Sequence, residues 1–246
     1  MEKFRSFILN NHSLVKEYYD CYYKRYKENN WKEKLRILFV NALSSGRDGK
    51  VSEKSKTIQE FEIMVNTMNS PHYKELLNRF HCTNYYDLFE SFKKFDQVGP
   101  KKSALFLRDI LFFDNVIKYT PINLKKELLV PVDRVIVRTM NSIFSENYNP
   151  DRIKTFNEIN NRAKVIFPEQ PIYLEDLWFW GRFYRCKENE SSSIPFCEFN
   201  KDLLIIDINV TKRYREKLLK FSYKNKKCPF KNICSHYFNG KLYTAS

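Results

Sequence analysis

Apolar residues recur at helical spacing along most of this 246-residue chain, and this pattern restricts the fold more than any other feature. Only five glycines and nine prolines are present, too few for a turn-rich all-β fold. The sequence therefore predicts a mostly α-helical protein, with LLIIDINV (203–210) as a strand-like run. The predicted helical segments are 13–27, 31–43, 73–80, 83–95, 103–113, 133–144, 150–167 and 173–186.

The length of the chain fits one large domain or two small lobes. The polar loop 44–56 is the predicted flexible connection, and Ser52 is expected to open the helix that follows it. Thr83 is the expected N-cap of the helix over 83–95. We expect a core over residues 1–186 and a C-terminal extension over 187–246, which is basic and rich in cysteine.

The charge balance predicts an anionic partner. Lys and Arg number 43 against 29 Asp and Glu, which gives a net charge of +14 at pH 7. Nucleic acid is the first candidate and an anionic membrane surface the second. The first residues lack the apolar core of a signal peptide, and no run of about 18 apolar residues occurs. We therefore expect a cytoplasmic protein. A membrane-surface protein would need an exposed apolar helix face beside the lysines, and the sequence shows no convincing one, so no membrane partner is expected. The protein is expected to be a monomer.

FDQVGPK (95–101) predicts a turn that leads into a helix. Pro100 suits the first helical position, because the N–H that proline lacks would have no partner there. A turn through Gly99 into a helix N-terminus points several unsatisfied amides outward, which makes an anion site. On a chain this basic, the expected anion is a nucleic-acid phosphate.

Asp133 follows the apolar run LLVPV and precedes VIV at the start of a helix. Asp is a good N-cap, since its carboxylate accepts the free amides of the first turn. Taken alone, a capping role is the simpler interpretation of Asp133.

Together the two segments resemble the helix-hairpin-helix DNA glycosylases, the superfamily of endonuclease III. FDQVGPK matches the family's LPGVGxK hairpin, with Gln97 where the first glycine normally stands, and VPVD (130–133) matches its (V/P)VD motif. The resemblance implies a two-lobed helical fold of this type, with the hairpin at about 84–113 and DNA and a flipped base between the lobes. Its implied partner is double-stranded DNA with a modified base, contacted by Gln97, Val98, Gly99, Lys102 and Ser103.

The resemblance also implies catalytic roles for Asp133 and Lys101. A carboxylate near C1′ stabilises the cation-like sugar that forms when an N-glycosidic bond breaks, and it can deprotonate the nucleophile. The amine of Lys101 would attack C1′, form a Schiff base and permit β-elimination of the strand. The alternative role of Lys101 is contact with a phosphate only.

Lys101 and Asp133 stand 32 positions apart, and a long spacer is a feature of the archaeal GO glycosylases, which remove 8-oxoguanine. FPEQPIYLEDLWFWG (167–181) is similar to the IPPLHLDSLLW motif of that subfamily. In this alignment Glu175 stands where the motif has Asp, and Phe179 stands where it has the pocket Trp. Shifting the alignment by one residue would place Trp178 or Trp180 in the pocket. The expected base pocket is Glu175, Trp178 and Phe179, with aromatic walls for a flipped base.

Six cysteines in a cytosolic chain indicate metal ligation more than disulfides. WGRFYRC (180–186), IPFC (194–197) and CPFKNIC (228–234) resemble the C-terminal cysteine loop of endonuclease III. This resemblance implies a [4Fe–4S] cluster, with residues 198–227 inserted in the loop; structural zinc and free thiols are the alternatives. The implied ligands are Cys186, Cys197, Cys228 and Cys234.

The predicted function is excision of a modified base from DNA, as in base excision repair, with associated lyase activity. Because the pocket positions are substituted, other lesions or the hypermodified bases of phage DNA are alternative substrates, and the latter would make the protein a defence enzyme. A non-catalytic DNA-binding module that uses the hairpin for phosphate contact is the competing class.

Overall fold

The computed structural model describes residues 1–24, 26–45, 55–184, 211–224, 227–230 and 234. Within these ranges the secondary structure is helical without a strand, which confirms the predicted mostly α-helical class. The strand-like run 203–210 lies outside them. No helix in the described ranges is long and apolar enough to cross a membrane.

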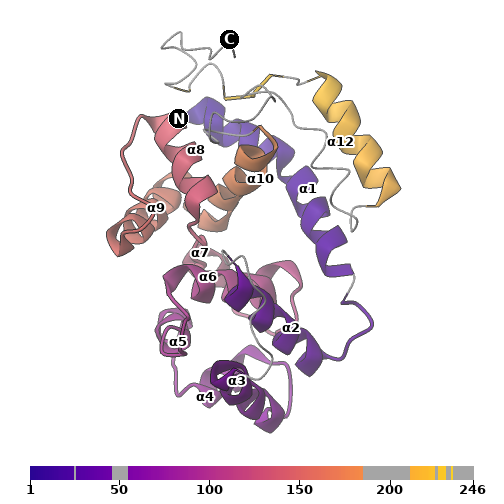
Figure 1. Cartoon of the computed structure of the whole chain (residues 1–246), viewed down its shortest axis with the longest axis vertical. Helices are drawn as coiled ribbons and strands as arrows, with labels where there is room; N and C mark the ends of the chain where they lie inside the picture. The colour runs from indigo at the N-terminus through magenta and orange to yellow at the C-terminus, as the bar shows by residue number, and fades with distance from the viewer. Residues whose placement is uncertain (25, 46–54, 185–210, 225–226, 231–233, 235–246) are drawn as a thin grey trace. The chain divides into compact units, whose positions relative to one another are not determined.

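The chain divides into two compact units (Figure 1). Unit 1 comprises Met1–Tyr22, Val132–Glu158 and Tyr173–Ser246, and unit 2 comprises Tyr23–Pro131 and Ile159–Ile172. Three helices cross a boundary and so contribute to both units: α1 (Glu2–Lys24), α9 (Ile153–Ile166) and the 3-10 helix η2 (Pro171–Glu175). The other helices of unit 1 are α8 (Arg134–Phe144), α10 (Asp176–Phe183) and α12 (Lys212–Lys224).

Helices α8 and α10 lie side by side in unit 1 (Figure 1). Gly181 makes this close approach possible. A Cβ at position 181 would overlap the Thr139 hydroxyl of α8 and come within 3.0 Å of Val135 Cγ1. A glycine is therefore required where α10 meets α8.

Helix α12 packs on α1 within unit 1. Tyr214, which is buried, donates its hydroxyl to the carbonyl oxygen of Leu14 over 2.6 Å, and Lys217 forms an ion pair with Glu17. The ring of Phe230 lies 5.6 Å from that of Phe4. The described residues of the expected C-terminal extension therefore belong to unit 1.

Unit 2 is built from short helices around an aromatic core. They are α2 (Trp31–Ser44), α3 (Lys56–Thr67), α4 (Tyr73–Arg79), α5 (Tyr85–Phe92), α6 (Pro100–Arg108), the π-helix η1 (Asp109–Phe113) and α7 (Leu124–Glu127). Stacked and edge-on ring pairs, the preferred geometries for aromatic contacts, join α2, α3 and α6, and tilted pairs connect the Phe92 ring of α5 to them. The rings are those of Phe39, Phe61, Phe80, Phe92, Phe95 and Phe106.

Two expected helix starts were wrong. Helix α3 begins at Lys56, and its N-cap is Ser55, which accepts the Ile58 N–H, so the helix does not open at Ser52. Helix α5 is capped by Asn84 and not by Thr83. The Thr83 hydroxyl instead donates to the Asp87 carboxylate over 2.7 Å, which leaves the capping role to its neighbour.

Candidate active site

The predicted hairpin is formed by α5, the turn at 93–99 and α6. Gln97 has φ of 63°, the left-handed conformation in which glycine is normally found. Gly99 is the N-cap of α6, without a side-chain cap, and Pro100 occupies the first turn as predicted. The turn therefore has a glycine-type backbone at position 97, although the residue there is glutamine.

Gly99 is exposed, and in the described ranges no atom beyond its two chain neighbours lies within 4 Å of the position that its Cβ would take. Its φ of −93° is open to any residue. Packing and backbone conformation therefore give no reason for a glycine here. A bare backbone at an exposed helix N-terminus does permit close approach of a ligand, and the free amides of the first turn favour an anion.

The basic side chains that follow have different surroundings. Lys101 is partly exposed, and it has no acidic partner among the residues that the structure describes. Lys102 instead donates from Nζ to the carbonyl oxygen of Leu43 over 2.7 Å, which ties α6 to the end of α2. Ser103 and Val98 are buried, so neither side chain lies on the exposed face of the hairpin.

The hairpin tip also carries a carboxylate. Asp96 is exposed and accepts a hydrogen bond from Gln97 Nε2 over 3.0 Å. Its carbonyl oxygen accepts the Thr57 hydroxyl over 3.3 Å, which fixes the turn against the start of α3. The negative charge of Asp96 opposes an anion at the tip.

Asp133 is the N-cap of α8, as its sequence context predicts. Its Oδ1 accepts the Ile136 N–H over 2.9 Å, and the residue is partly exposed. Capping fixes the carboxylate at the start of the helix and leaves part of its surface open. The structure places Asp133 in unit 1 and Lys101 in unit 2.

The chain that leads to Asp133 is held by two side chains of unit 2 that the sequence did not indicate. Asn160 accepts the Val130 N–H over 2.7 Å and donates to the Val130 carbonyl oxygen over 3.2 Å. The Leu129 N–H donates to the hydroxyl oxygen of the buried Tyr85 over 3.1 Å. These bonds satisfy a buried extended segment that pairs with no strand in the described part of the chain.

Two adjacent carboxylates are buried where η2 meets α10. Glu175 accepts the Tyr19 hydroxyl over 3.1 Å. Asp176 lies 3.0 Å from Nδ1 of His12, and burial raises the pKa of Asp176 to about 6, although His12 acts to lower it. Both partners come from α1, and sequence reasoning did not identify them.

The aromatic residues considered for the base pocket differ in how far they are buried. Phe179 and Trp180 are fully buried in unit 1, where the Phe179 ring lies 5.5 Å from that of Tyr18. Trp178 is partly exposed, and the guanidinium of Arg182 lies 5.2 Å from its ring centre. Phe179 is thus a core residue in this structure, and Trp178 is the expected pocket aromatic that retains exposed surface.

Of the four expected cluster ligands, Cys186 and Cys197 lie outside the described residues. Cys228 and Cys234 are both buried and form no disulfide, and the Cys234 N–H donates to the carbonyl oxygen of Phe230 over 2.9 Å. Two thiols have the donor chemistry of an iron–sulfur or zinc site but supply half of its ligands. In the described part of the chain, no three potential ligands gather.

Comparison with known proteins gave no match: no protein-family model, curated protein or solved structure is similar to this chain.

Proposed function

We propose that this protein is a DNA glycosylase that excises a modified base, with the hairpin of α5 and α6 bound to the DNA backbone and Asp133 as the catalytic carboxylate. The single observation that carries the proposal is the hairpin turn. Gln97 adopts a left-handed backbone at a position that glycine normally occupies in such hairpins. Gly99 is exposed, and neither packing nor backbone conformation requires a glycine there.

The hairpin is suited to phosphate because it offers amides without a side-chain cap. Helix α6 begins at Pro100, and the bare Gly99 lets a phosphate oxygen approach the first-turn amides closely. Such contacts position a protein on DNA without reading sequence. The net charge of +14 adds a favourable, salt-dependent term.

Asp133 supports the catalytic part of the proposal. Its carboxylate is held by the Ile136 N–H and remains partly exposed. A carboxylate fixed in this way can stabilise positive charge on a sugar without reorganising during the reaction. Lys101, partly exposed in the first turn of α6, is the proposed nucleophile for an accompanying lyase step.

The base pocket is proposed around the start of α10. Trp178 offers an aromatic face, and Arg182 offers a cation beside it. Stacking on such a face is the usual way to hold a flipped base. The subfamily resemblance makes 8-oxoguanine the first candidate substrate.

An iron–sulfur cluster remains part of the proposal through Cys228 and Cys234, with Cys186 and Cys197 as the other two ligands. The buried thiols of the first two fit the donor chemistry of a cluster. A bound cluster would stabilise the C-terminal segment, and no step of base excision requires it.

The cap formed by Asp133 favours a second candidate, a DNA-binding module without catalysis. The hydrogen bond to Ile136 gives the carboxylate a structural role that is independent of any reaction. The two candidates differ in one property: the module binds DNA and releases no base.

The test uses duplexes that each carry one oxidised, deaminated or alkylated base, with 8-oxoguanine among them. Wild-type protein, Asp133→Asn and Lys101→Gln are incubated with each duplex, with and without borohydride. Asn caps helices about as well as Asp, so Asp133→Asn removes the charge and keeps the cap. The expected result is base release that Asp133→Asn abolishes and a borohydride-trapped adduct that Lys101→Gln abolishes.

The hairpin has a separate test in binding to an undamaged duplex. Gly99→Asp keeps a good N-cap but places a carboxylate at the proposed phosphate site, so it should weaken binding at least tenfold. Asp96→Asn removes the opposing charge at the tip and should strengthen binding at low salt. Binding that neither variant changes would show that the hairpin does not contact DNA.

A further inference from the structure

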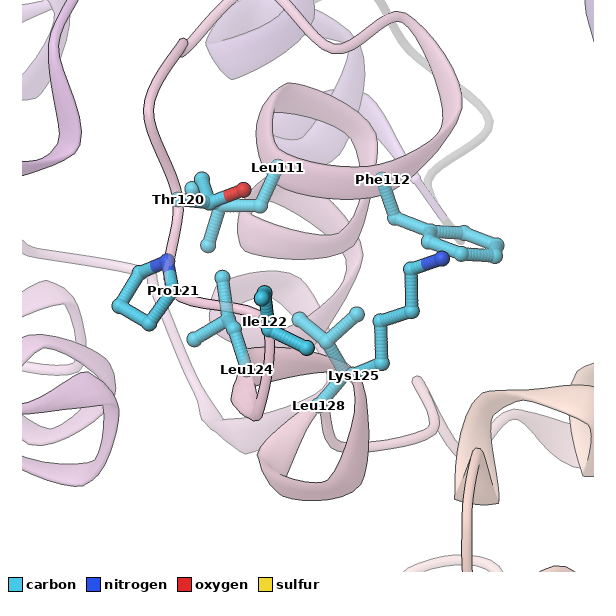
Figure 2. Close-up of a pocket in the computed structure, with 8 residues that line it drawn as sticks. All are labelled: Leu111, Phe112, Thr120, Pro121, Ile122, Leu124, Lys125 and Leu128. Carbon is cyan, nitrogen blue, oxygen red and sulfur yellow. The ribbon is translucent and has the colours of Figure 1, made fainter.

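A groove in unit 2, lined mainly by apolar residues, lies apart from the residues assigned above. One wall is the π-helix η1, and the other sides are the loop 120–122 and α7 (Figure 2). A π-helix is rare and is found frequently at functional sites. The lining residues are Leu111, Phe112, Thr120, Pro121, Ile122, Leu124, Lys125 and Leu128.

Backbone hydrogen bonds hold the segment that leads into the loop 120–122. The backbone of Lys118 is bound on both sides, since its N–H donates to Pro71 over 2.6 Å and its carbonyl oxygen accepts the Tyr73 N–H over 2.9 Å. The Ile117 N–H donates to the carbonyl oxygen of Ile110, which connects the loop to η1. Within the lining, the Leu124 N–H donates to the carbonyl oxygen of Pro121 over 3.0 Å, which holds the loop against α7. An ordered lining lowers the entropic cost of binding.

The apolar side chains at the rim are unusually exposed. Ile122 is 94% exposed and the neighbouring Tyr119 is 81% exposed, while Leu111, Leu124 and Leu128 form a buried floor. The groove has a volume of about 280 Å³, at or below the roughly 300–1,000 Å³ of most small-molecule sites. A space of this size suits one large apolar side chain better than a cofactor.

The charge at the groove is positive. Lys125 is the charged residue in the lining, and it extends toward the ring of Phe112 (Figure 2). In the described ranges it has no acidic partner, whereas its neighbour Lys126 pairs with Glu169 over 2.7 Å. An apolar side chain flanked by carboxylates would complement both the floor and this ammonium group.

We propose that the groove is a docking site for a short acidic segment of a partner protein, with one aromatic or large aliphatic side chain seated between η1 and α7. The apolar anchor would supply most of the affinity, as anchors in preformed pockets do, and a carboxylate paired with Lys125 would select the acidic sequence. This site is independent of Asp133 and of the proposed excision reaction.

The test uses a fluorescein-labelled peptide, EEFLEE, with EEAAEE and KKFLKK as matched peptides, and fluorescence anisotropy with the full chain. Ile122→Ser and Lys125→Glu change exposed residues of the groove and should leave the fold intact. The control variants are Ile63→Ser and Lys56→Glu, which change exposed residues of α3. Thermal unfolding of each variant checks the fold.

Saturable binding of EEFLEE, weakened at least tenfold by Ile122→Ser and by Lys125→Glu and unchanged in both controls, is the expected result. EEAAEE and KKFLKK should bind at least tenfold more weakly to wild-type protein. Lys125→Glu should bind KKFLKK more tightly than wild-type protein does, a reversal that loss of structure cannot produce. No saturable binding of EEFLEE, or equal binding in the groove and control variants, would overturn the proposal.

Discussion

Gly181→Ala tests the contact between α8 and α10. The new methyl group would overlap the Thr139 hydroxyl and approach Val135 Cγ1 to 3.0 Å. Thr139 cannot rotate away without cost, because its hydroxyl donates to the carbonyl oxygen of Val135 over 2.8 Å. Substitution at position 181 therefore affects both packing and a buried hydrogen bond.

Three contributions determine the expected size of the effect. Overpacking in a core costs about 1–3 kcal/mol. Loss of the Thr139 hydrogen bond destabilises the fold by about 1 kcal/mol more. Alanine in place of glycine inside a helix stabilises it by about 1 kcal/mol. We expect Gly181→Ala to lower the free energy of unfolding by about 1–3 kcal/mol.

Urea unfolding followed by tryptophan fluorescence is a suitable assay, because Trp180 is buried in α10 beside the substituted position. With a slope of about 1–3 kcal/mol per molar urea, the midpoint should fall by about 1 M. Gly99→Ser is the matched control, since no described atom beyond the chain neighbours lies within 4 Å of its Cβ position and serine is a good N-cap. Its midpoint should not fall.

A second substitution identifies the cause. Thr139→Ala removes the overlapping hydroxyl, so the double variant should recover at least half of the stability that Gly181→Ala loses. If Gly181→Ala is neutral or stabilising, helix propensity alone governs the position and the packing argument is refuted.

Three further predictions concern stability. Gln97→Gly should raise the free energy of unfolding by about 1 kcal/mol, because glycine adopts φ of 63° without strain; an unchanged urea midpoint would contradict this. The pKa of Asp176 is raised to about 6 by burial, so its protonation stabilises the fold: the contribution is complete below about pH 4 and is lost as the pH rises through about 6. The stability of the wild type relative to Asp176→Asn, measured by urea unfolding at pH 4 and at pH 7, should therefore fall by on the order of 3 kcal/mol between the two, and a constant difference would refute the shift. Tyr23→Phe removes the 2.6 Å hydrogen bond to the buried Asp109 and should cost about 1–3 kcal/mol by thermal or urea unfolding, whereas no change would show that the carboxylate is satisfied without it.

Helix positions followed from the sequence where a capping residue or proline marks a boundary. Pro100 fixed the start of α6, and Asp133 fixed the start of α8, because each residue type has a specific role in the first turn. Thr83 and Asn84 are both good caps, so the sequence could not decide between them. The π-helix could not be predicted, because DILFF continues an apolar helix without a break.

The turn could be placed from sequence, but its conformation could not. Gln97 gives no signal for a left-handed backbone, since only the surrounding hairpin imposes it. Likewise, His12 and Asp176 are 164 positions apart, and nothing local in either segment predicts their contact. Contacts of this kind depend on how α1 packs against α10.

Base release in a single turnover, by wild-type protein and by Asp133→Asn, tests the central claim most directly. The substrate is the duplex that wild-type protein cleaves best among the modified-base panel, with protein in excess and the released base measured directly. The account predicts loss of release by at least a hundredfold in Asp133→Asn, with an unchanged urea midpoint because asparagine retains the cap. Equal release by both proteins, or DNA binding without release of any base in the panel, would contradict it.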